Sequence, residues 1–235
     1  VLEIRPDMES GNLKWEDAEK GEKRFAPAVE FDQVSLRYKG AAADSLSGIS
    51  FRAERGQTIG IIGGTGSGKS SLVNMIPRFY DAASGMVKIC GRDIREYDID
   101  DLRSHVGMVL QKAVLFKGTI AENIRWGKED ATDDEIMEAL EISQAKEFVE
   151  TKEGGTDFLI EQGGRNLSGG QKQRLTIARA LVRKPEILIL DDSASALDFA
   201  TDAKLRGAIR GMKENPTVFI VSQRASSIQY ADQII

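Results

Sequence analysis

The run Gly63-Gly64-Thr65-Gly66-Ser67-Gly68-Lys69-Ser70 constrains the fold of this chain more than any other feature. It fits the pattern G-x-x-x-x-G-K-[ST], follows the apolar residues 59–62 and precedes a stretch with helical spacing that contains Leu72, Val73 and Ile76. A strand that passes through such a loop into a helix is the context that a phosphate-binding loop requires. The sequence therefore predicts an α/β fold built around this strand, loop and helix.

Each residue type in the loop has a role in binding phosphate. Glycines let backbone N–H groups approach the phosphates, and the helix N-terminus adds a partial positive charge. Lys69 is expected to reach the β- and γ-phosphates, and the Ser70 hydroxyl to bind Mg²⁺. The alternative is a glycine-rich turn with an exposed lysine, which the order of strand, loop and helix disfavours. We expect a nucleotide site formed by Gly63, Gly64, Thr65, Gly66, Ser67, Gly68, Lys69, Ser70 and Ser71.

Strand-like and helix-like segments alternate along the chain from Val29. Strands are predicted at 29–38, 57–62, 86–90, 106–110, 187–190 and 217–221. The last three are continuous apolar runs, as expected for a parallel sheet covered on both faces. Helices are predicted at 68–76, 133–142, 144–150, 169–182 and 201–212. Residues 112–166 have helical patterns and no convincing strand, which indicates a helical lobe inserted into the α/β core.

Composition excludes several classes of protein. A net charge of −5 argues against a nucleic-acid partner or an anionic membrane surface. The chain contains no apolar run long enough to span a membrane. Its single cysteine, Cys90, excludes an internal disulfide and is compatible with a reducing cytosol.

A carboxylate follows the buried strand predicted at 187–190. Ligands of open α/β sheets bind at the carboxyl ends of the strands. Asp191 is therefore expected to hold Mg²⁺ together with Ser70. The alternative role for Asp191 is to cap a following helix, which the presence of the phosphate loop disfavours.

A second glycine-rich helix start, Leu167-Ser168-Gly169-Gly170-Gln171, follows the helical lobe. Ser168 and Gln171 have the spacing of a capping pair, and capping alone is the simplest role. The adjacent glycines favour a further role, because a helix start without side chains lets a phosphate approach. This start is too far along the chain to share the phosphates of the first loop. We therefore expect each chain to carry two half-sites, so that two copies must meet face to face to complete a site.

Together these motifs make the chain resemble the nucleotide-binding domain of ATP-binding-cassette (ABC) transporters from about residue 29 to the end. The resemblance implies a P-loop NTPase core with a mainly parallel sheet, an N-terminal antiparallel β subdomain and an inserted α-helical lobe. It also implies that ATP and Mg²⁺ are bound, and that residues 167–171 are the signature that acts on the ATP of a partner domain.

Further residues match motifs of that family. Tyr38 matches the aromatic residue that stacks on adenine. Gln111 matches the glutamine that touches Mg²⁺ and the attacking water and faces the membrane-spanning partner. Residues 193–198 match the loop that crosses the dimer interface, which includes Ser195, Ala196, Leu197 and Asp198.

Three segments resemble the exporter branch of the family. Residues 115–124 look like the exporter version of the helical lobe, and residues 156–164, with Glu161, are similar to the segment that touches the coupling helices. Residues 1–7 look like the tail after the last transmembrane helix of exporters whose two domains share one chain. We expect residues 1–28 to be a linker and residues 29–235 to be the nucleotide-binding domain, cut short at its C-terminus. The resemblance implies a transmembrane domain of the same polypeptide and a place at the cytoplasmic face of the plasma membrane.

Two positions depart from the family pattern. The general base, a glutamate after the Mg²⁺ aspartate, is Asp192 here, and the switch histidine after the next strand is Gln223. Aspartate is one methylene shorter, so its carboxylate falls short of a water that glutamate reaches within about 3 Å. Glutamine can hydrogen-bond a phosphate but cannot carry a proton. His105, the only histidine, precedes the strand of Gln111 and cannot fill the switch role. Because loss of a positioned base costs about 10²- to 10⁴-fold in rate, we expect a site that binds ATP and hydrolyses it poorly.

The two departures favour one half of a heterodimeric exporter, in which the intact signature completes the partner's active site. A homodimer in which Asp192 still serves as base is the alternative. A soluble ATP-gated clamp of the chromosome-structure or translation-factor type would need a long coiled coil or a second cassette and a basic surface, none of which the sequence contains. A regulatory ATP-binding module and an importer domain remain open, although residues 115–124 favour export.

Overall fold

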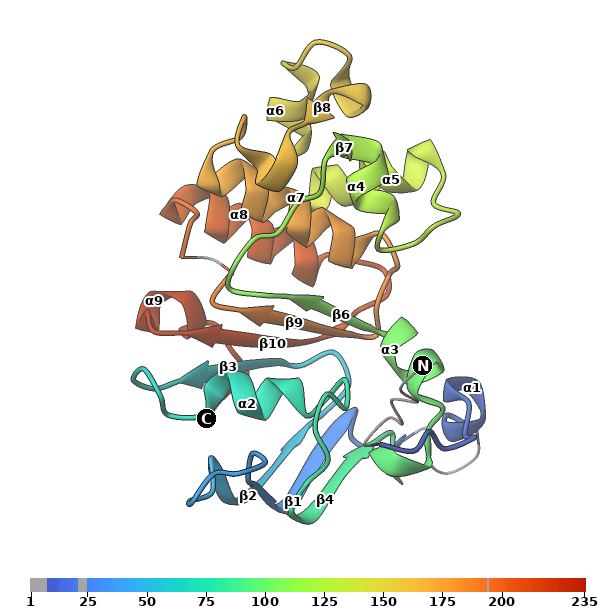
Figure 1. Ribbon diagram of the computed structural model, residues 1–235, viewed down its shortest axis with the longest axis vertical. Coiled ribbons are helices and arrows are strands. Elements are labelled where there is room, and N and C mark those ends of the chain that lie inside the picture. The colour runs from blue at the N-terminus through green and yellow to red at the C-terminus, as the bar shows by residue number, and fades with distance from the viewer. Residues whose placement is uncertain (1–7, 21–24, 194) are drawn as a thin grey trace. The chain divides into compact units, whose positions relative to one another are not determined.

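The chain folds into two compact units, and the computed structural model describes residues 8–20, 25–193 and 195–235 (Figure 1). The first unit consists of Val1–Arg55 and Thr65–Ser104, and the second of Gly56–Gly64 and His105–Ile235. The expected tail at residues 1–7 and Ala194 of the expected interface loop lie outside the described residues. Each unit contains its own main β-sheet.

The first unit is built on an antiparallel sheet with the strand order β2-β1-β4-β5. Its strands are β1 (Val29–Leu36), β2 (Leu46–Ala53), β4 (Ser84–Ile89) and β5 (Arg92–Asp93). Phe31 of β1 lies opposite Phe51 of β2, with ring centroids 4.7 Å apart. Such cross-strand pairs stabilise a sheet. The antiparallel β subdomain expected from the family resemblance is confirmed.

β2 is a strand that the sequence pattern does not predict. It lies at the edge of its sheet, and only its first and last residues, Leu46 and Ala53, are buried. The residues between them are exposed or half-buried. An edge strand of this kind has no continuous apolar face, so its sequence lacks the alternation by which strands are recognised.

The helix after the phosphate loop, α2 (Lys69–Asn74), buries Leu72 and Val73. It is shorter than the predicted helix at 68–76, because Met75 and Ile76 continue the chain in turns while remaining buried. The unit also contains the short helices η2 (Ile94–Glu96) and α3 (Ile99–Ser104), which the sequence does not predict.

Part of the linker predicted at residues 1–28 is packed structure. The short helix α1 (Trp15–Ala18) contains Trp15, which is 2% exposed. The backbone N–H of Trp15 donates to Asp101 Oδ2 at 2.6 Å, and Leu13 forms a parallel bridge with Tyr97. Residues 13–18 are therefore packed on their unit, and their role as part of a linker stays a prediction. One large aromatic side chain in a polar segment is enough to bury apolar surface and anchor the backbone.

The second unit is built on a parallel sheet with the strand order β11-β3-β10-β9-β6. Its strands are β3 (Thr58–Ile62), β6 (Val106–Val109), β9 (Ile187–Asp191), β10 (Thr217–Ser222) and β11 (Gln233–Ile234). Every residue of β9 and β10 is buried, as the continuous apolar runs predict. Helices α7 (Gly169–Leu181) and α8 (Phe199–Arg210) lie on one side of β6, β9 and β10, and the short helix α9 (Ala225–Ile228) follows β10 (Figure 1).

The inserted helical lobe packs on α7. It contains α4 (Ile120–Arg125), α5 (Asp133–Ile142), α6 (Lys146–Glu150) and the short helices η3 (Gly155–Asp157) and η4 (Gln162–Gly164). α5 has the predicted bounds, and Thr132 and Glu135 close a capping box at its start. The expectation of no strand in this lobe is wrong. β7 (Gly118–Thr119) and β8 (Leu159–Ile160) form an antiparallel pair, too short for a hydrophobic period to reveal.

Candidate functional site

The parallel sheet of the second unit brings several predicted site positions to one edge. Ser222 of β10 lies opposite Ile62 of β3, and Leu190 of β9 lies opposite Val109 of β6. β10 and β9 are also paired in parallel. Because parallel strands end at the same edge of a sheet, the residues that follow them lie together there. These residues are Gly63, Gln111, Asp192 and Gln223.

The phosphate loop connects β3 to α2, with Gly63 and Gly64 in the second unit and the residues from Thr65 onward in the first. Gly66 and Gly68 have φ angles of 81° and 90°, a region that residues with a Cβ rarely adopt. A Cβ on Gly68 would also lie 2.8 Å from the carbonyl oxygen of Ser45. Backbone conformation and packing both require glycine at this position.

Lys69 and Ser70 open α2. The residue before them, Gly68, is the N-cap of this helix and has no side chain to occupy the first N–H groups. Lys69 Nζ donates to Ser67 Oγ at 3.3 Å, and Ser70 is exposed. A lysine beside a helix start without a side-chain cap is an arrangement that attracts a phosphate.

Two contacts fix Tyr38. Its hydroxyl lies 2.8 Å from Ser71 Oγ, and its ring meets that of Tyr80 edge to face, with centroids 5.0 Å apart. Ser71, predicted only as a nucleotide ligand, therefore also holds the aromatic ring in place. Sequence reasoning does not find this contact, because 33 positions separate the two residues.

The acidic strand end brings Asp192 and Gln111 together. Asp191 is the last residue of β9 and is 6% exposed. Asp192 follows with a φ angle of 46°, which is uncommon for a residue other than glycine. Its N–H donates to the Val221 carbonyl at 2.9 Å, and its Oδ2 accepts from Gln111 Nε2 at 3.1 Å. The residue in the position of the base is thus paired with the glutamine that the family resemblance assigns to Mg²⁺ and water.

Gln223 and His105 lie at opposite ends of the strands. Gln223 is exposed and directly follows β10. His105 directly precedes β6, and its Nδ1 lies 2.9 Å from Oε2 of Glu186, which precedes β9. His105 therefore lies at the opposite edge of the sheet from Gln223 and cannot take the switch role, which agrees with the sequence-based expectation.

The second glycine-rich segment forms a complete capping box at the start of α7. Ser168 Oγ accepts from the Gln171 N–H at 3.3 Å, and Gln171 Oε1 accepts from the Ser168 N–H at 3.0 Å. Leu167 is buried beneath. A Cβ on Gly169 would meet no described atom within 4 Å, whereas one on Gly170 would lie 3.2 Å from the Ala196 carbonyl oxygen. The signature segment therefore lies against the predicted interface loop of the same unit.

That loop, at residues 195–198, also contacts the acidic strand end. Ser195 Oγ donates to the Asp192 carbonyl at 2.8 Å, and Leu197 is buried. Asp198 caps α8 by accepting from the Thr201 N–H at 2.9 Å, and this hydrogen bond lowers the pKa of the Asp198 carboxyl. The contact between Ser195 and Asp192 is a local feature that the motif alone does not predict.

An exposed aromatic pair is a feature that the sequence prediction missed. Trp126, at the end of α4, is 68% exposed and stacks on Phe116 with centroids 4.7 Å apart. The guanidinium of Arg179 lies 5.6 Å from the centroid of the Phe116 ring. A tryptophan within a helical pattern is more often in the core, so its exposure is not readable from the sequence.

The sequence model of the family described as ABC transporter matches residues 46–195, which is more than half of the chain. The chain belongs to the ABC transporter family. The matched span contains the phosphate loop, the helical lobe, the signature at 167–171 and Asp192.

Individual ABC transporter proteins are similar to almost all of the chain. It is 46% identical over 212 residues to the uncharacterized ABC transporter ATP-binding protein YfiB of Bacillus subtilis, covering 90% of the chain and 37% of YfiB. It is 38% identical over 236 residues to the ATP-dependent lipid A-core flippase of Vibrio vulnificus, covering 100% of the chain and 39% of the flippase. A bacterial Atm1-family ABC exporter solved with ATP bound superposes with a TM-score of 0.85 and 35% identity, over 89% of the chain and 37% of the exporter.

The chain therefore carries the ATP-binding and ATPase domain of an ABC transporter. It spans somewhat more than a third of the length of these relatives. Within the described ranges, none of the helices is long and apolar enough to cross a membrane.

Proposed function

We propose that this domain powers export across a membrane as part of a polypeptide that also carries membrane-spanning segments. The flippase of Vibrio vulnificus and the Atm1-family exporter are the relatives that support this proposal. In such a protein the domain would lie at the cytoplasmic face of the plasma membrane. The transported substrate would be chosen by the membrane-spanning part.

An exposed apolar surface supports a membrane-spanning partner. Phe116, Trp126, Leu110 and Val114 are all exposed, and the last three line a cavity of about 180 Å³ in the second unit. Exposed apolar surface of this kind marks protein–protein contacts. Gln111 directly follows Leu110, so a partner bound at this surface would adjoin the glutamine at the sheet edge.

We infer that the chain's own site binds ATP and hydrolyses it slowly, and the pairing of Asp192 with Gln111 is the observation that carries this inference. The Asp192 carboxylate accepts a hydrogen bond at 3.1 Å from the Gln111 amide, in a backbone conformation with a φ angle of 46°. A general base must itself lie within hydrogen-bond reach of the water that it deprotonates. A short carboxylate paired with a neighbouring amide is poorly suited to that task, and the amide of Gln223 cannot accept the proton in its place.

Mg²⁺ fits the donor groups that the family resemblance assigns to it. These are the Ser70 hydroxyl, the Asp191 carboxylate and the Gln111 amide oxygen. Hard oxygen donors of this kind, few in number, suit an ion held mostly by phosphate and water. The part of the chain that the structure describes has no group of three or more His, Cys, Asp or Glu residues that could hold a metal by themselves. When bound, Mg²⁺ would neutralise charge on the phosphates.

We further propose that the signature at 167–171 serves the ATP of a second nucleotide-binding domain, from a different subunit. Nothing in the described part of this unit requires a glycine at position 169, because its Cβ would enter open space and its backbone is not left-handed. A glycine there is explained if a phosphate from outside the chain must approach the helix start.

The proposal is tested by changing Asp192 and Gln223 to the residues of the family pattern in a protein whose partner site cannot hydrolyse ATP. In the full-length protein assembled with its partner, Gly170→Asp should stop hydrolysis at the partner's site, since the signature would then repel its phosphates. Adding Asp192→Glu and Gln223→His should raise ATP turnover at this chain's own site about 10- to 100-fold. Steady-state phosphate release measures both steps.

One control variant and two possible outcomes separate the alternatives. Lys69→Ala should abolish the restored turnover, because it removes the cation of the phosphate loop. In a homodimer Gly170→Asp would silence both sites, so that no further substitution could restore activity. If the Gly170→Asp protein turns over ATP as fast as the protein that also carries Asp192→Glu and Gln223→His, the weak site is refuted and Asp192 is a working base.

A further inference from the structure

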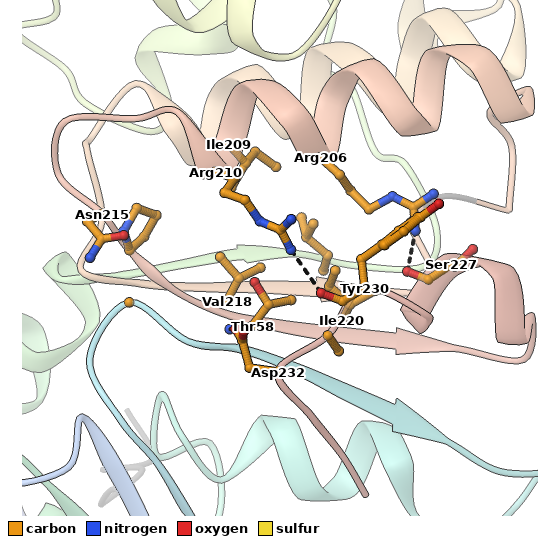
Figure 2. Close-up of a pocket in the computed structure, with 14 residues that line it drawn as sticks. Thr58, Arg206, Ile209, Arg210, Asn215, Val218, Ile220, Ser227, Tyr230 and Asp232 are labelled. Carbon is orange, nitrogen blue, oxygen red and sulfur yellow. Dashed lines mark hydrogen bonds between the residues drawn. The ribbon is translucent and has the colours of Figure 1, made fainter.

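Arg206 joins two parts of the second unit that are separate in the sequence. Its guanidinium donates through Nη2 to Asp202 Oδ2, 2.5 Å away and one turn earlier on α8. Through Nη1 it donates to the carbonyl oxygens of Ser226, at 3.3 Å, and of Ser227. Figure 2 shows the bond to Ser227 beside a cavity of about 230 Å³.

The ion pair between Asp202 and Arg206 is largely shielded from solvent. The Asp202 side chain is 8% exposed and that of Arg206 is 19% exposed. Burial raises the pKa of the Asp202 carboxyl, although the charge of Arg206 acts in the opposite direction. A planar guanidinium held along one edge by a carboxylate presents its other N–H groups in a fixed direction. Asp202 thus orients Arg206 toward α9.

α9 depends on such contacts, because a helix of four residues is not stable alone. Ser226 and Ser227 are its middle residues, and Arg206 binds both of their carbonyl groups. Ile228, at the end of α9, packs so closely on β3 that a Cβ on Gly60 would lie 2.8 Å from its own Cβ. α9 is therefore held by β3 through Ile228 and by α8 through Arg206.

Gln223 lies in the link between β10 and α9. Its neighbour Arg224 donates through its N–H to Ser222 Oγ at 3.0 Å and through Nη2 to the Ser195 carbonyl at 3.4 Å. β10 fixes the start of this link, and α9 fixes its end. The position of Gln223 therefore depends on Arg206, although the two side chains belong to different elements.

We propose that Arg206 is a positioning residue, which holds the backbone of Gln223 where the glutamine amide can hydrogen-bond the γ-phosphate of ATP. This inference rests on the proposed function of the sheet edge as an ATP site. α8 begins directly after the interface loop at 195–198, so the same helix connects that loop to Gln223. It follows that Arg206 affects the preference for ATP over ADP without touching either nucleotide.

The experiment measures this preference at the chain's own site. The full-length protein, assembled with its partner, is photo-labelled with 8-azido-ATP, and the label on this chain is competed with unlabelled ATP or ADP. Because Gln223 would contact only the γ-phosphate, Gln223→Ala should weaken ATP binding about tenfold and leave ADP binding unchanged. Arg206→Gln should have the same effect, and Arg206→Lys, which keeps one charged donor, a smaller one.

The combination of variants distinguishes positioning from general stability. If Arg206 acts through Gln223, the double variant Gln223→Ala, Arg206→Gln should lose no more ATP affinity than either single variant. Arg210 provides the matched control, since it lies one turn further along α8 and donates to the Tyr230 carbonyl at 2.8 Å, beyond α9 (Figure 2). Arg210→Gln should leave the ratio of ATP to ADP affinity unchanged.

Several results would overturn the inference. These are an equal effect of Arg206→Gln on ATP and ADP, additive losses in the double variant, or a Gln223→Ala variant that binds ATP normally. If Arg206→Gln does not accumulate as folded protein, Asp202→Asn, which leaves the guanidinium in place but removes the charge that orients it, is judged on the same ratio and should lower it about threefold. Lys69→Ala separates this inference from the proposed function, because labelling that survives it would refute the phosphate-loop assignment itself.

Discussion

The two glycine-rich helix starts of this chain differ in what their glycines do. At the start of α2, Gly68 has a φ angle of 90°, and its Cβ would clash with the Ser45 carbonyl. At the start of α7, Gly169 has neither constraint, and Ser168 and Gln171 already cap the helix. The first glycine is required by the fold of its own unit. The second is permitted by the fold but not required by it, and we propose that a phosphate held by a second molecule is the reason for it.

This difference indicates which helix start serves the chain's own nucleotide. α2 has a glycine as N-cap, so no cap side chain competes with a phosphate for the N-terminus of this helix. α7 satisfies part of its N-terminus with its own side chains and exposes a surface without a Cβ. The start of α7 is capped by Ser168 and Gln171, and the exposed Gly169 leaves room for a further group. Such a helix start suits a phosphate that a second molecule brings.

The largest expected effect is on ATP turnover and comes from placing a charge at Gly169, at the start of α7. Gly169→Asp should lower ATP turnover of the assembled protein about 10³-fold, because a carboxylate would face the phosphates held by the partner. The stability of the chain should not fall, since an acidic residue in the first turn interacts favourably with the helix dipole. Phosphate release and thermal unfolding measure the two quantities.

Gly207→Asp is the control for this substitution. Gly207 is an exposed glycine of α8 whose Cβ would enter open space, so the chemical change is the same without the signature. Turnover should stay at the wild-type level. Equal turnover of the Gly169→Asp protein and the wild type would contradict the role of α7 in a second site.

The next effect is on folding and concerns the other helix start. Gly68→Ala should destabilise the chain by about 3 kcal/mol, because it adds a left-handed alanine to a steric clash with backbone. Gly66→Ala has a similar φ angle of 81° but open space around the Cβ, so about 1 kcal/mol is expected. Denaturant unfolding of the chain measures both. If the two variants are equally stable, packing around Gly68 contributes nothing.

The features that the sequence predicts well are those with a strong local pattern. The phosphate loop, the buried strands β9 and β10 and the capping box at Ser168 each depend on residues within a few positions of one another. Local hydrogen bonding and apolar periodicity specify them, and both can be read from the sequence. The alternation of strands and helices along the chain and the position of the inserted lobe follow from the same patterns.

The features that the sequence does not predict depend on distant partners. β2 is a strand because it pairs with β1. Trp15 is buried because its segment is held by a hydrogen bond to Asp101 and by the bridge between Leu13 and Tyr97. Likewise the hydrogen bond between Gln111 and Asp192 follows from the register of two strands. Motif matching names these two residues separately, but it contains no information on their contact.

The smallest expected effect decides between the two roles of Ser168, capping alone or capping with a partner's phosphate. Ser168→Ala should cost about 1 kcal/mol of stability through loss of the cap. Thr132→Ala is its match, because Thr132 Oγ1 accepts from the Glu135 N–H at 3.2 Å in an equivalent box on α5. The two variants should therefore unfold at similar denaturant concentrations. Only Ser168→Ala should also lower turnover of the assembled protein, by about tenfold, since its hydroxyl lies at the surface where the second phosphate would bind. If both variants keep full turnover, Ser168 does no more than start its helix, and the phosphate contacts at α7 come from the backbone of the two glycines.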